Sequence, residues 1–453
     1  MRSNRLLSVS HAAEDSPPNV ASDLHARIVK RSARIGIIGL GYVGLPTAVA
    51  FAEAGFEVVG VDTSDKRREG VNAGQSHVEG VDGATVSRLV KAGRIKAVAS
   101  LVDAGDLDIV DICVPTPLDK SRDPDVSAIL SVIQEIRDTV RRGQLLILTS
   151  TTYPGTTVEL LQPAVEAAGH VVGADVFIAF APERIDPGNA KFGIRNTPRV
   201  VGGVTEQCTQ LATELLQTVI DQVVPVSNPT AAEMSKLLEN TFRHVNIALA
   251  NEVAIMCRHL GLDVWEVIEA AATKPYGFMP FYPGPGLGGH CIPVDPSYLS
   301  WKLRRLNYNA RFISLADDIN SHMPEYVVSR AAEVLNLDSK SLRGSNVLVL
   351  GVAYKSNIAD LRESPAVDVL TLLRRAGAEV SYADPHVPGP LELEGGSLMA
   401  VELSSGTLHA QDLVVIATAH AAFDWKLVRK EARAVLDTRG WSRGQHLANW
   451  HSL

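Results

Sequence analysis

The sequence predicts an α/β protein in which two Rossmann-like, doubly wound domains are joined by a long central helix in a helical middle domain. Three observations carry this prediction. Short β-branched segments alternate with helical segments between residues 34 and 204, and the same alternation starts again at residue 345. Between these blocks, residues 230–260 contain neither Gly nor Pro and have apolar residues at helical spacing. Alternating strands and helices are typical of parallel sheets covered by helices.

The first block begins with a βαβ unit. Residues 35–38 are a predicted strand, followed by a glycine turn, an amphipathic helix and a second strand at residues 57–61. The further strand candidates of this block are residues 107–115, 144–151, 175–183 and 199–204. We expect a flexible leader at residues 1–32, which are polar and contain Pro17-Pro18.

The middle of the chain is predicted to be helical, with helices at residues 230–260 and 263–272 and a Gly- and Pro-rich loop, PYGFMPFYPGPGLGGHCIPVDP, behind them. The second α/β block follows with NVLVLGVAYK, AEVSYADP, DLVVIATA and RAVLDTRG. The expected domains are therefore residues 33–228, which bind a dinucleotide, residues 229–328, which form the middle domain, and residues 329–453, a second nucleotide fold.

The bulk composition excludes several classes of protein. With 46% hydrophobic residues and a mean hydropathy of +0.08, whole-chain disorder is excluded. A net charge of −8 leaves no basic surplus for nucleic acid. No stretch reaches the roughly 18 apolar residues of a membrane-spanning helix, and the N-terminus lacks the apolar core of a signal peptide. We expect a cytoplasmic protein with no membrane or nucleic-acid partner.

The four cysteines show neither a disulfide pattern nor a metal-binding one. They lie far apart, without a CxxC pair, at Cys113, Cys208, Cys257 and Cys291. This spacing predicts that the protein has no metal site and favours a reducing compartment.

A dinucleotide-binding motif follows the first strand. Its residues are Gly39, Leu40, Gly41, Tyr42, Val43 and Gly44. The glycines let the backbone approach a pyrophosphate at the N-terminus of the next helix. Asp62 ends the second strand, where a carboxylate accepts both ribose hydroxyls and repels a 2′-phosphate, so NAD is favoured over NADP. Arg67 is a candidate for the adenosine side; the alternative is a solvated arginine at a helix start.

Cys291 stands out among the cysteines because it lies in the glycine-rich string GLGGHCIPVD. Glycines such as Gly288 would let a substrate approach, and His290 is a candidate for favouring the thiolate, with a structural hydrogen bond as the alternative. The other three cysteines fall in predicted strands or helices and are expected to be inert. Asp295 is a candidate for activating a water, with a helix cap as the alternative.

Lys236 and Asn240 are spaced i, i+4 on the long helix and share one face. Together they are suited to hold a developing oxyanion, and Arg243 adds a third polar group; the alternative is a solvated helix face. Glu183 ends a predicted buried strand and is a candidate general acid or base, with an ion pair to Arg184 as the rival interpretation.

The second nucleotide fold has no GxGxxG motif. The turn after its first strand is Gly351-Val352-Ala353-Tyr354-Lys355, and Arg362 follows shortly after. Cations at Lys355 and Arg362 predict that this fold binds the diphosphate of a different nucleotide.

Taken together, these motifs resemble the UDP-glucose/GDP-mannose dehydrogenase family over about residues 34–442. The strings that carry the resemblance, in this order, are GLGYVGLP, STTYPGTT, APERIDPGN, KLLENTFRHVNIALANE, PGPGLGGHCIPVDP and AYKSNIADLRESP. They look most like the branch that acts on UDP-N-acetylglucosamine and forms the 6-uronate of surface polysaccharides.

The resemblance implies roles for residues at matching positions. Cys291 would capture the C6 aldehyde as a thiohemiacetal, and a second hydride transfer would give a thioester, so two NAD would be consumed per sugar. Lys236 and Asn240 would hold the C6 oxygen, and Glu183 and Asp295 would handle the proton and the water. The remaining implied positions are Thr151 for the water and the cofactor, Thr116 and Arg362 for the cofactor, and Lys355 for the UDP. A homodimer through the central helix is also implied.

Two departures from the UDP-glucose branch favour an N-acetylated sugar. Arg184 follows the strand-end glutamate, where that branch commonly has an apolar residue. Lys274-Pro275-Tyr276 occupies the region where that branch places an arginine.

Other functions stay open from the sequence. The substrate alternatives are UDP-N-acetylmannosamine, UDP-glucose and GDP-mannose. A one-step hydroxy-acid dehydrogenase would leave the Cys291 loop and the second nucleotide fold without a purpose. A nucleotide-sugar-binding regulator would not need Cys291, Lys236, Asn240 and Asp295 together, and a thiol hydrolase built on Cys291 and His290 would not need the dinucleotide motif.

Overall fold

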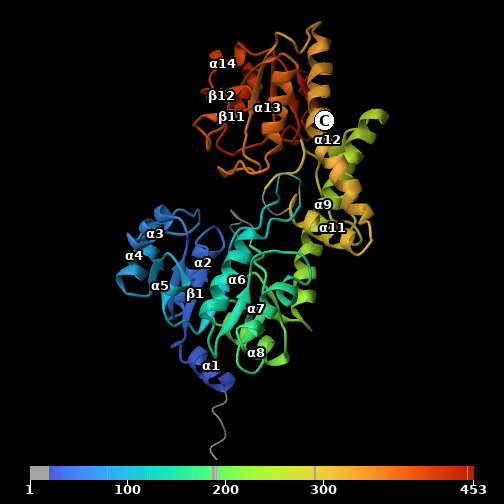
Figure 1. Cartoon of the computed structure of the whole chain (residues 1–453). Helices are drawn as coiled ribbons and strands as arrows, with labels where there is room; N and C mark the ends of the chain where they lie inside the picture. Colours follow the sequence, from blue (N-terminus) through green and yellow to red (C-terminus); the bar gives the residue numbers. More distant parts are fainter. Residues whose placement is uncertain are drawn as a thin grey trace, which may run out of the picture. The chain divides into compact units, whose positions relative to one another are not determined.

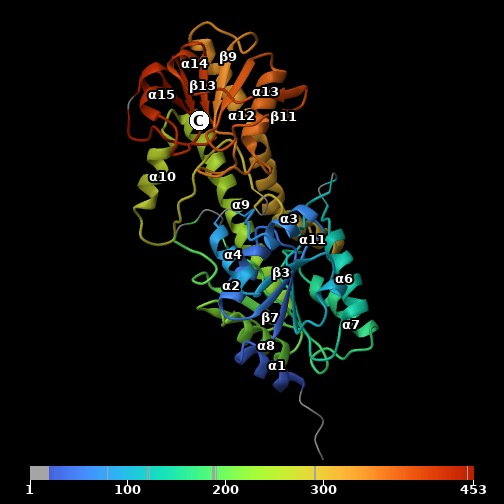
Figure 2. The ribbon, with the colours of Figure 1, turned by 90° about the vertical axis from the view of Figure 1, so that its left-hand side faces the viewer.

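The computed structural model describes residues 20–78, 80–119, 121, 123–185, 189, 191–289, 292–445 and 447–453 (Figures 1 and 2). The chain divides into two compact units. The first unit comprises Met1–Pro115, Ala128–Ser150 and Gly155–Ala232, and the second comprises Thr116–Ser127, Thr151–Pro154 and Glu233–Leu453. No helix within the described part of the chain is long and apolar enough to cross a membrane.

The first unit is built on an eight-stranded sheet with the order β3-β2-β1-β4-β5-β6-β7-β8. Neighbouring strands are parallel except for β6 and β7. The strands are β1 (Arg34–Ile38), β2 (Glu57–Val61), β3 (Ile95–Val98), β4 (Ile109–Ile112), β5 (Leu145–Leu148), β6 (Phe177–Phe180), β7 (Arg199–Gly203) and β8 (Val223–Pro225). The first six have the Rossmann order, and the order reverses between β1 and β4, where such sheets bind dinucleotides.

Helices cover both faces of this sheet. They are α2 (Gly44–Glu53), α3 (Asp65–Asn72), α4 (Gly83–Lys91), α5 (Leu101–Ala104), α6 (Ser127–Thr139), α7 (Gln162–Ala167), which follows a π-helical turn at Thr157–Leu161, and α8 (Glu206–Leu216). Along β1, Ile35 and Ile37 belong to one apolar core and Ile38 to another. Because successive strand residues point to opposite faces, the sheet has a core on each side. The predicted doubly wound fold is confirmed for this unit.

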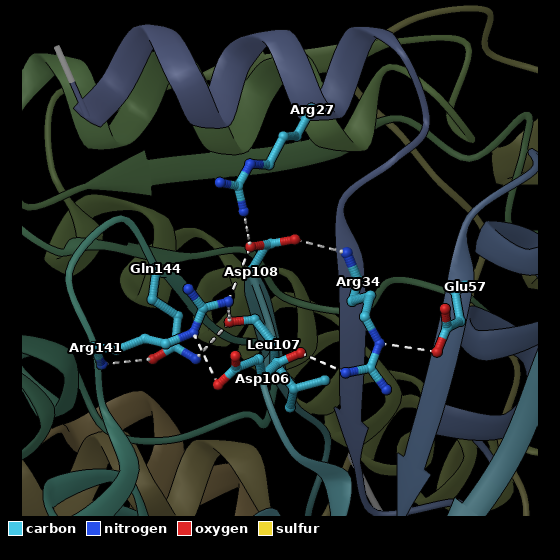
Figure 3. Close-up of polar contacts among 8 residues, drawn as sticks. All are labelled: Arg27, Arg34, Glu57, Asp106, Leu107, Asp108, Arg141 and Gln144. Carbon is cyan, nitrogen blue, oxygen red and sulfur yellow. Dashed lines mark hydrogen bonds and ion pairs between the residues drawn. The ribbon is translucent and has the colours of Figure 1, made fainter. Parts of the chain in front are cut away.

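An additional helix, α1 (Val20–Val29), precedes the sheet. The predicted flexible leader at residues 1–32 is wrong for residues 20–29, which form α1; residues 1–19 lie outside the described part of the chain. Leu24 and Ile28 of α1 are buried in the first core. Figure 3 shows how Arg27 of α1 reaches Asp108 beside β4, at 2.7 Å. The buried residues Ala21, Leu24 and Ile28 follow the i, i+3, i+7 spacing of an amphipathic helix, a local signal that the leader prediction did not use.

Within its described residues, the second unit has four helices that precede its sheet. They are α9 (Pro229–Leu260), whose first residues belong to the first unit, α10 (Val264–Ala272), α11 (Asp295–Arg305) and α12 (Arg311–Leu337). The predicted helices at residues 230–260 and 263–272 agree with α9 and α10 to within a residue.

The sheet of the second unit is fully parallel, with the order β10-β9-β13-β14-β15. Its strands are β9 (Asn346–Leu350), β10 (Glu379–Ala383), β13 (Leu413–Ile416), β14 (Val435–Asp437) and β15 (Trp450–Ser452). Around it lie α13 (Pro365–Arg375), α14 (Ser405–His409), α15 (Trp425–Glu431) and the hairpin β11 (Leu391–Leu393) and β12 (Gly396–Leu398). This is a second doubly wound sheet, and its order reverses between β9 and β13.

Candidate active site

The glycine turn of the first unit lies at the carboxyl end of β1, beside the point where the strand order reverses. Gly39 has a φ of +90°, and a Cβ added there would lie 2.6 Å from the Cys113 carbonyl oxygen. A Cβ on Gly44, the first residue of α2, would lie 1.7 Å from the Gly39 carbonyl oxygen. At Gly41 nothing lies within 4 Å of an added Cβ, so the backbone is open to a ligand there. This arrangement suits a pyrophosphate at the start of α2.

Asp62 lies at the carboxyl end of β2 and holds the glycine turn. One carboxylate oxygen accepts the Leu40 backbone N–H at 2.8 Å, and the other accepts the Ser64 backbone N–H at 2.8 Å. Each carboxylate oxygen has a second acceptor site, so Asp62 can still bind ribose hydroxyls. Arg67, in the first turn of α3, is 3.4 Å from Asp62, which places it beside the expected adenosine position.

The other predicted residues of the turn differ in exposure. Tyr42 is exposed, and Val43 is the residue before α2 and is half-buried. The backbone of both residues forms part of the glycine turn, and the Tyr42 side chain is exposed.

Glu183 follows β6 and is half-buried, with both carboxylate oxygens 2.7 Å from the Ile185 backbone N–H. The predicted rival, an ion pair with Arg184, is not among the described contacts of Glu183. The Arg184 guanidinium instead donates to the Pro198 carbonyl at 2.8 Å.

Burial raises the pKa of the Cys113 thiol well above its usual value, and the charges of Asp111 and Glu183 raise it further.

The second unit brings Asp295 against two predicted residues far from it in sequence, Lys236 and Asn240. Lys236 and Asn240 lie on the inward face of α9 and Asp295 begins α11; all three are buried. The Asn240 side-chain amide donates a hydrogen bond to the Asp295 carboxylate. Burial raises the pKa of Asp295 to about 6, although the Lys236 charge and the Asn240 hydrogen bond oppose this rise. A carboxyl group with such a pKa is suited to general base catalysis near neutral pH.

Other predicted residues are placed around this cluster. Thr116 is buried and hydrogen-bonds the hydroxyl of Tyr298, which lies on α11. Thr151 is half-buried, in a short segment that also belongs to the second unit. Arg243, two turns beyond Lys236, is exposed and is not part of the buried cluster.

The glycine-rich loop before α11 packs against the second nucleotide fold. The Gly289 backbone N–H donates to the Arg362 carbonyl at 3.0 Å. A Cβ on Gly288 would lie 2.5 Å from Cβ of Tyr354, and one on Gly289 would lie 2.8 Å from the Tyr354 ring. His290 and Cys291 lie outside the described residues. The loop is described up to Gly289 and again from Ile292.

The predicted cations of the second nucleotide fold lie after β9. Lys355 is half-buried at the carboxyl edge of the sheet, beside the point where the strand order reverses. Arg362 is exposed and pairs with Asp360 at 2.6 Å. Arg439, which the sequence analysis missed, follows β14 at the same edge. Burial lowers the pKa of Arg439 to about 10, so it stays charged at neutral pH.

The second fold differs from the first where a dinucleotide fold binds ribose. Asp384 follows β10 as Asp62 follows β2, and it accepts the Val352 backbone N–H at 2.7 Å. Here, however, the carboxylate also pairs with His420 at 3.0 Å, and both side chains are fully buried. Although burial opposes it, the His420 and backbone hydrogen bonds lower the pKa of Asp384. The carboxylate of Asp384 is thus enclosed and is not exposed to a ribose as a dinucleotide fold requires.

The cysteines outside the loop are buried, as expected of inert thiols: Cys113, Cys208 and Cys257. Burial also raises the pKa of the Cys257 thiol, and the Asp263 charge adds to this. Thiols with a raised pKa form little thiolate and react slowly.

Three buried polar residues near the loop are not among the predicted site residues: His244, Asn251 and Asn320. A signal was available for His244, because it continues the i, i+4 spacing of Lys236 and Asn240. Asn320 had none, because its partners lie on another helix.

Comparison with known proteins covers all three parts of the chain. Models of the UDP-glucose/GDP-mannose dehydrogenase family match residues 33–220 as its NAD binding domain, 230–322 as its central domain and 348–443 as its UDP binding domain. The three matched domains are those of an NAD-dependent dehydrogenase that acts on nucleotide-linked sugars. The chain belongs to the UDP-glucose/GDP-mannose dehydrogenase family.

Similar proteins include the UDP-N-acetyl-D-mannosamine dehydrogenase of Pyrococcus horikoshii, 36% identical over 88% of this chain and 93% of that protein. The Escherichia coli K12 enzyme of the same name is 35% identical over 86% of this chain and 94% of that protein. A solved structure of UDP-D-ManNAc dehydrogenase from Pyrococcus horikoshii has a TM-score of 0.84 and 33% identity, covering 92% of this chain and 98% of that chain. This protein is accordingly an NAD-dependent UDP-sugar dehydrogenase.

Proposed function

We propose that this protein oxidises the C6 alcohol of a UDP-N-acetylhexosamine to the uronic acid through a thioester on Cys291. The observation that carries the proposal is the buried cluster of Lys236, Asn240 and Asp295. Asp295 follows Cys291 by four residues. The cluster therefore combines a cation, an amide and a carboxyl of raised pKa close in sequence to the proposed nucleophile.

The proposed reaction has two oxidations and one hydrolysis. Loss of a hydride and the hydroxyl proton converts the C6 alcohol to an aldehyde, and the Cys291 thiolate adds to it as a thiohemiacetal. Loss of a second hydride gives a thioester, which water attacks so that the carbon–sulfur bond breaks and the thiol is released. Bound NAD supplies the hydride acceptor in each oxidation, so two NADH form per sugar.

Lys236 and Asn240 hold the C6 oxygen as charge develops on it. Asp295 takes a proton from the attacking water, which Thr151 positions, and Glu183 moves the proton of the substrate hydroxyl.

The binding roles complete the proposal. Lys355 contacts the UDP diphosphate, with Arg439 as a second cation at the same sheet edge, and Arg184, Arg243 and Gly288 contact the sugar. The proposed NAD contacts are Gly39, Gly41, Tyr42, Val43, Gly44, Asp62, Arg67, Thr116, Thr151 and Arg362.

The configuration of the sugar at C2 separates two candidate substrates. UDP-N-acetylmannosamine is favoured, because relatives with 35–36% identity over most of this chain carry that name. UDP-N-acetylglucosamine is the second candidate, because the sequence strings quoted above look most like the branch that acts on it. Both sugars satisfy the expectation of an N-acetylated substrate.

The first experiment measures NADH per mole of sugar, with each UDP-sugar limiting and NAD in excess, followed by mass analysis of the product. A ratio near two with a uronate product supports the proposal and identifies the C2 epimer. A ratio of one contradicts the double oxidation. In the same assay Cys291→Ser should form no uronate while it still binds UDP; uronate formation by this variant would exclude the thioester.

We also propose a homodimer through α9. Large apolar side chains are exposed along this helix at Met234, Leu238, Phe242, Leu249 and Met256. An apolar groove of about 730 Å³ adjoins them, formed by α9, α10 and the segment Gly277–Phe281. A second copy related by a twofold axis would present the same apolar face. The domain bounds at residues 33–228, 229–328 and 329–453 and a cytoplasmic location stay predictions.

A further inference from the structure

Three buried polar residues connect α9 and α12 with two points of the glycine-rich loop, Gly284 and Ile292. His244 and Asn251 lie on α9 and Asn320 lies on α12, with exposed fractions of 2%, 0% and 4%. None of them belongs to the cluster of Lys236, Asn240 and Asp295. A buried polar group costs free energy unless it is hydrogen-bonded, so the partners of these three side chains indicate what they do.

The two asparagine side chains bond each other and reach the backbone of His244. The side-chain oxygen of Asn251, Oδ1, accepts the backbone N–H of Gly284 at 2.9 Å. The Asn251 side-chain nitrogen, Nδ2, donates to Oδ1 of Asn320 at 2.9 Å. Nδ2 of Asn320 in turn donates to the backbone carbonyl of His244 at 3.2 Å.

The His244 side chain lies next to the neighbour of the proposed nucleophile. Nδ1 of His244 lies 3.3 Å from the backbone carbonyl oxygen of Ile292. Because a carbonyl oxygen only accepts, this contact requires that Nδ1 carries the proton. Gly284 and Ile292 stand at the two ends of the segment that contains Cys291, and Ile292 is its immediate neighbour.

The helix that holds this loop also carries the oxyanion groups. Lys236, Asn240 and His244 follow one another at i, i+4 and i+8 on α9. A shift of the loop along α9 would therefore change the distance between the thiol and the groups that hold the C6 oxygen. Catalytic geometry is sensitive to displacements of this kind, since a misplacement of about 1 Å can cost on the order of 100-fold in rate.

We propose that His244, Asn251 and Asn320 are positioning residues that fix the Cys291 segment relative to Lys236 and Asn240. This inference rests on the proposed role of Cys291 as nucleophile. Because His244 is proposed to act through the Ile292 carbonyl, its loss should change the chemical step and leave nucleotide binding intact.

The test compares three substitutions of His244 in the full-length protein. In His244→Asn the side-chain amide nitrogen can take the place of Nδ1, whereas in His244→Gln it lies one bond further out, and His244→Phe has no donor. We expect kcat to fall tenfold or more in His244→Phe and His244→Gln, and to recover at least in part in His244→Asn. The dissociation constants for NAD and UDP should change less than twofold.

A second readout follows the thiol itself. The rate at which iodoacetamide alkylates Cys291, measured by mass spectrometry, should change with kcat across the three variants. His259→Phe is the matched control, because His259 is exposed on the same helix. Asn320→Leu and its exposed control on α12, Asn336→Leu, repeat the comparison independently, so the proposal stays testable if His244→Phe does not fold.

The outcomes separate the two proposals. Equal kcat and alkylation rates in His244→Phe, Asn320→Leu and the wild type would overturn the positioning role, even if Cys291→Ser is inactive. Uronate formation by Cys291→Ser would instead overturn the proposed function. Loss of kcat together with NAD and UDP binding in every variant, His244→Asn included, would assign these residues a purely structural role and also overturn the inference.

Discussion

At the scale of single residues, Asp295 determines the expected pH dependence. Burial raises its pKa to about 6. A carboxyl that activates water must be ionised, so kcat should rise with pH along a limb near pH 6. Asp295→Asn should remove this limb and most of kcat. The measurement is kcat from pH 5 to 8 at saturating substrates; a limb that persists in the variant would assign the ionisation to another group.

The same ionisation affects stability with the opposite sign to a salt-bridged carboxylate. The folded-state pKa of Asp295 lies above its ordinary value of 3.8, so the folded state binds the proton more tightly. Its contribution to the free energy of unfolding is largest below about pH 4 and is lost as pH rises through 6. Urea denaturation should therefore show Asp295→Asn gaining stability relative to the wild type between pH 4 and 7.

Asp62 should control NAD affinity. It holds the glycine turn through Leu40 and has acceptor sites left for the ribose. Asp62→Ala loses hydrogen bonds worth about 1–3 kcal/mol, so the KM for NAD should rise roughly 5- to 150-fold. The KM for the UDP-sugar, measured in the same preparation, serves as control. An unchanged KM for NAD would mean that the ribose lies elsewhere.

At the scale of elements, α1 and β4 are joined by the polar network of Figure 3. Asp108 accepts the Arg27 guanidinium at 2.7 Å, the Arg34 backbone N–H at 2.9 Å and the Arg141 guanidinium at 2.9 Å. This network lies at the amino ends of the strands, opposite the edge that carries the glycine turn.

Asp108→Ala should therefore reduce stability and leave catalysis unchanged. Removing the acceptor leaves three donors without their partner, which costs about 1–3 kcal/mol of unfolding free energy. Urea denaturation and steady-state kinetics check the two halves of the prediction. Asp106→Ala is the control, because the exposed Asp106 side chain meets the network only through a 4.0 Å ion pair with Arg141. A change in the KM for NAD would show that the network also supports the cofactor site.

At the scale of the whole molecule, the proposed dimer makes the clearest prediction. Leu249 is 54% exposed in the middle of α9 and also lines the apolar groove. A charge there would be buried without a partner in the dimer, so Leu249→Glu should halve the mass measured by light scattering. Leu337→Glu, on an exposed site of α12, should not. A monomeric wild type would refute the dimer.

Both α/β sheets and the long helix could be predicted from the sequence, because strand and helix periods are local signals. The pairing of Lys236 with Asn240 was predictable for the same reason, since i, i+4 spacing fixes a shared face. The position of Asp295 against them was not, because it depends on how α11 packs on α9.

Long-range packing also decides which unit some short segments join. Residues Thr116–Ser127 and Thr151–Pro154 lie within the first α/β block in sequence but belong to the second unit. Tyr298 of α11 donates to the Pro117 carbonyl at 3.0 Å, and Tyr153 packs on Trp301 with 5.1 Å between ring centroids. Partners so far apart in sequence leave no local pattern.

The packing of Tyr354 against the glycine-rich loop limits how this protein can diverge. At Gly288 even a methyl group would meet the Glu363 carbonyl oxygen at 2.8 Å as well as Tyr354. Gly289 has a φ of +88° and faces the Tyr354 ring. Substitutions at Gly288 and Gly289 are therefore not tolerated without a change in the surrounding packing, whatever sugar is oxidised. Lineages that acquire a new substrate should retain both glycines and collect their substitutions elsewhere.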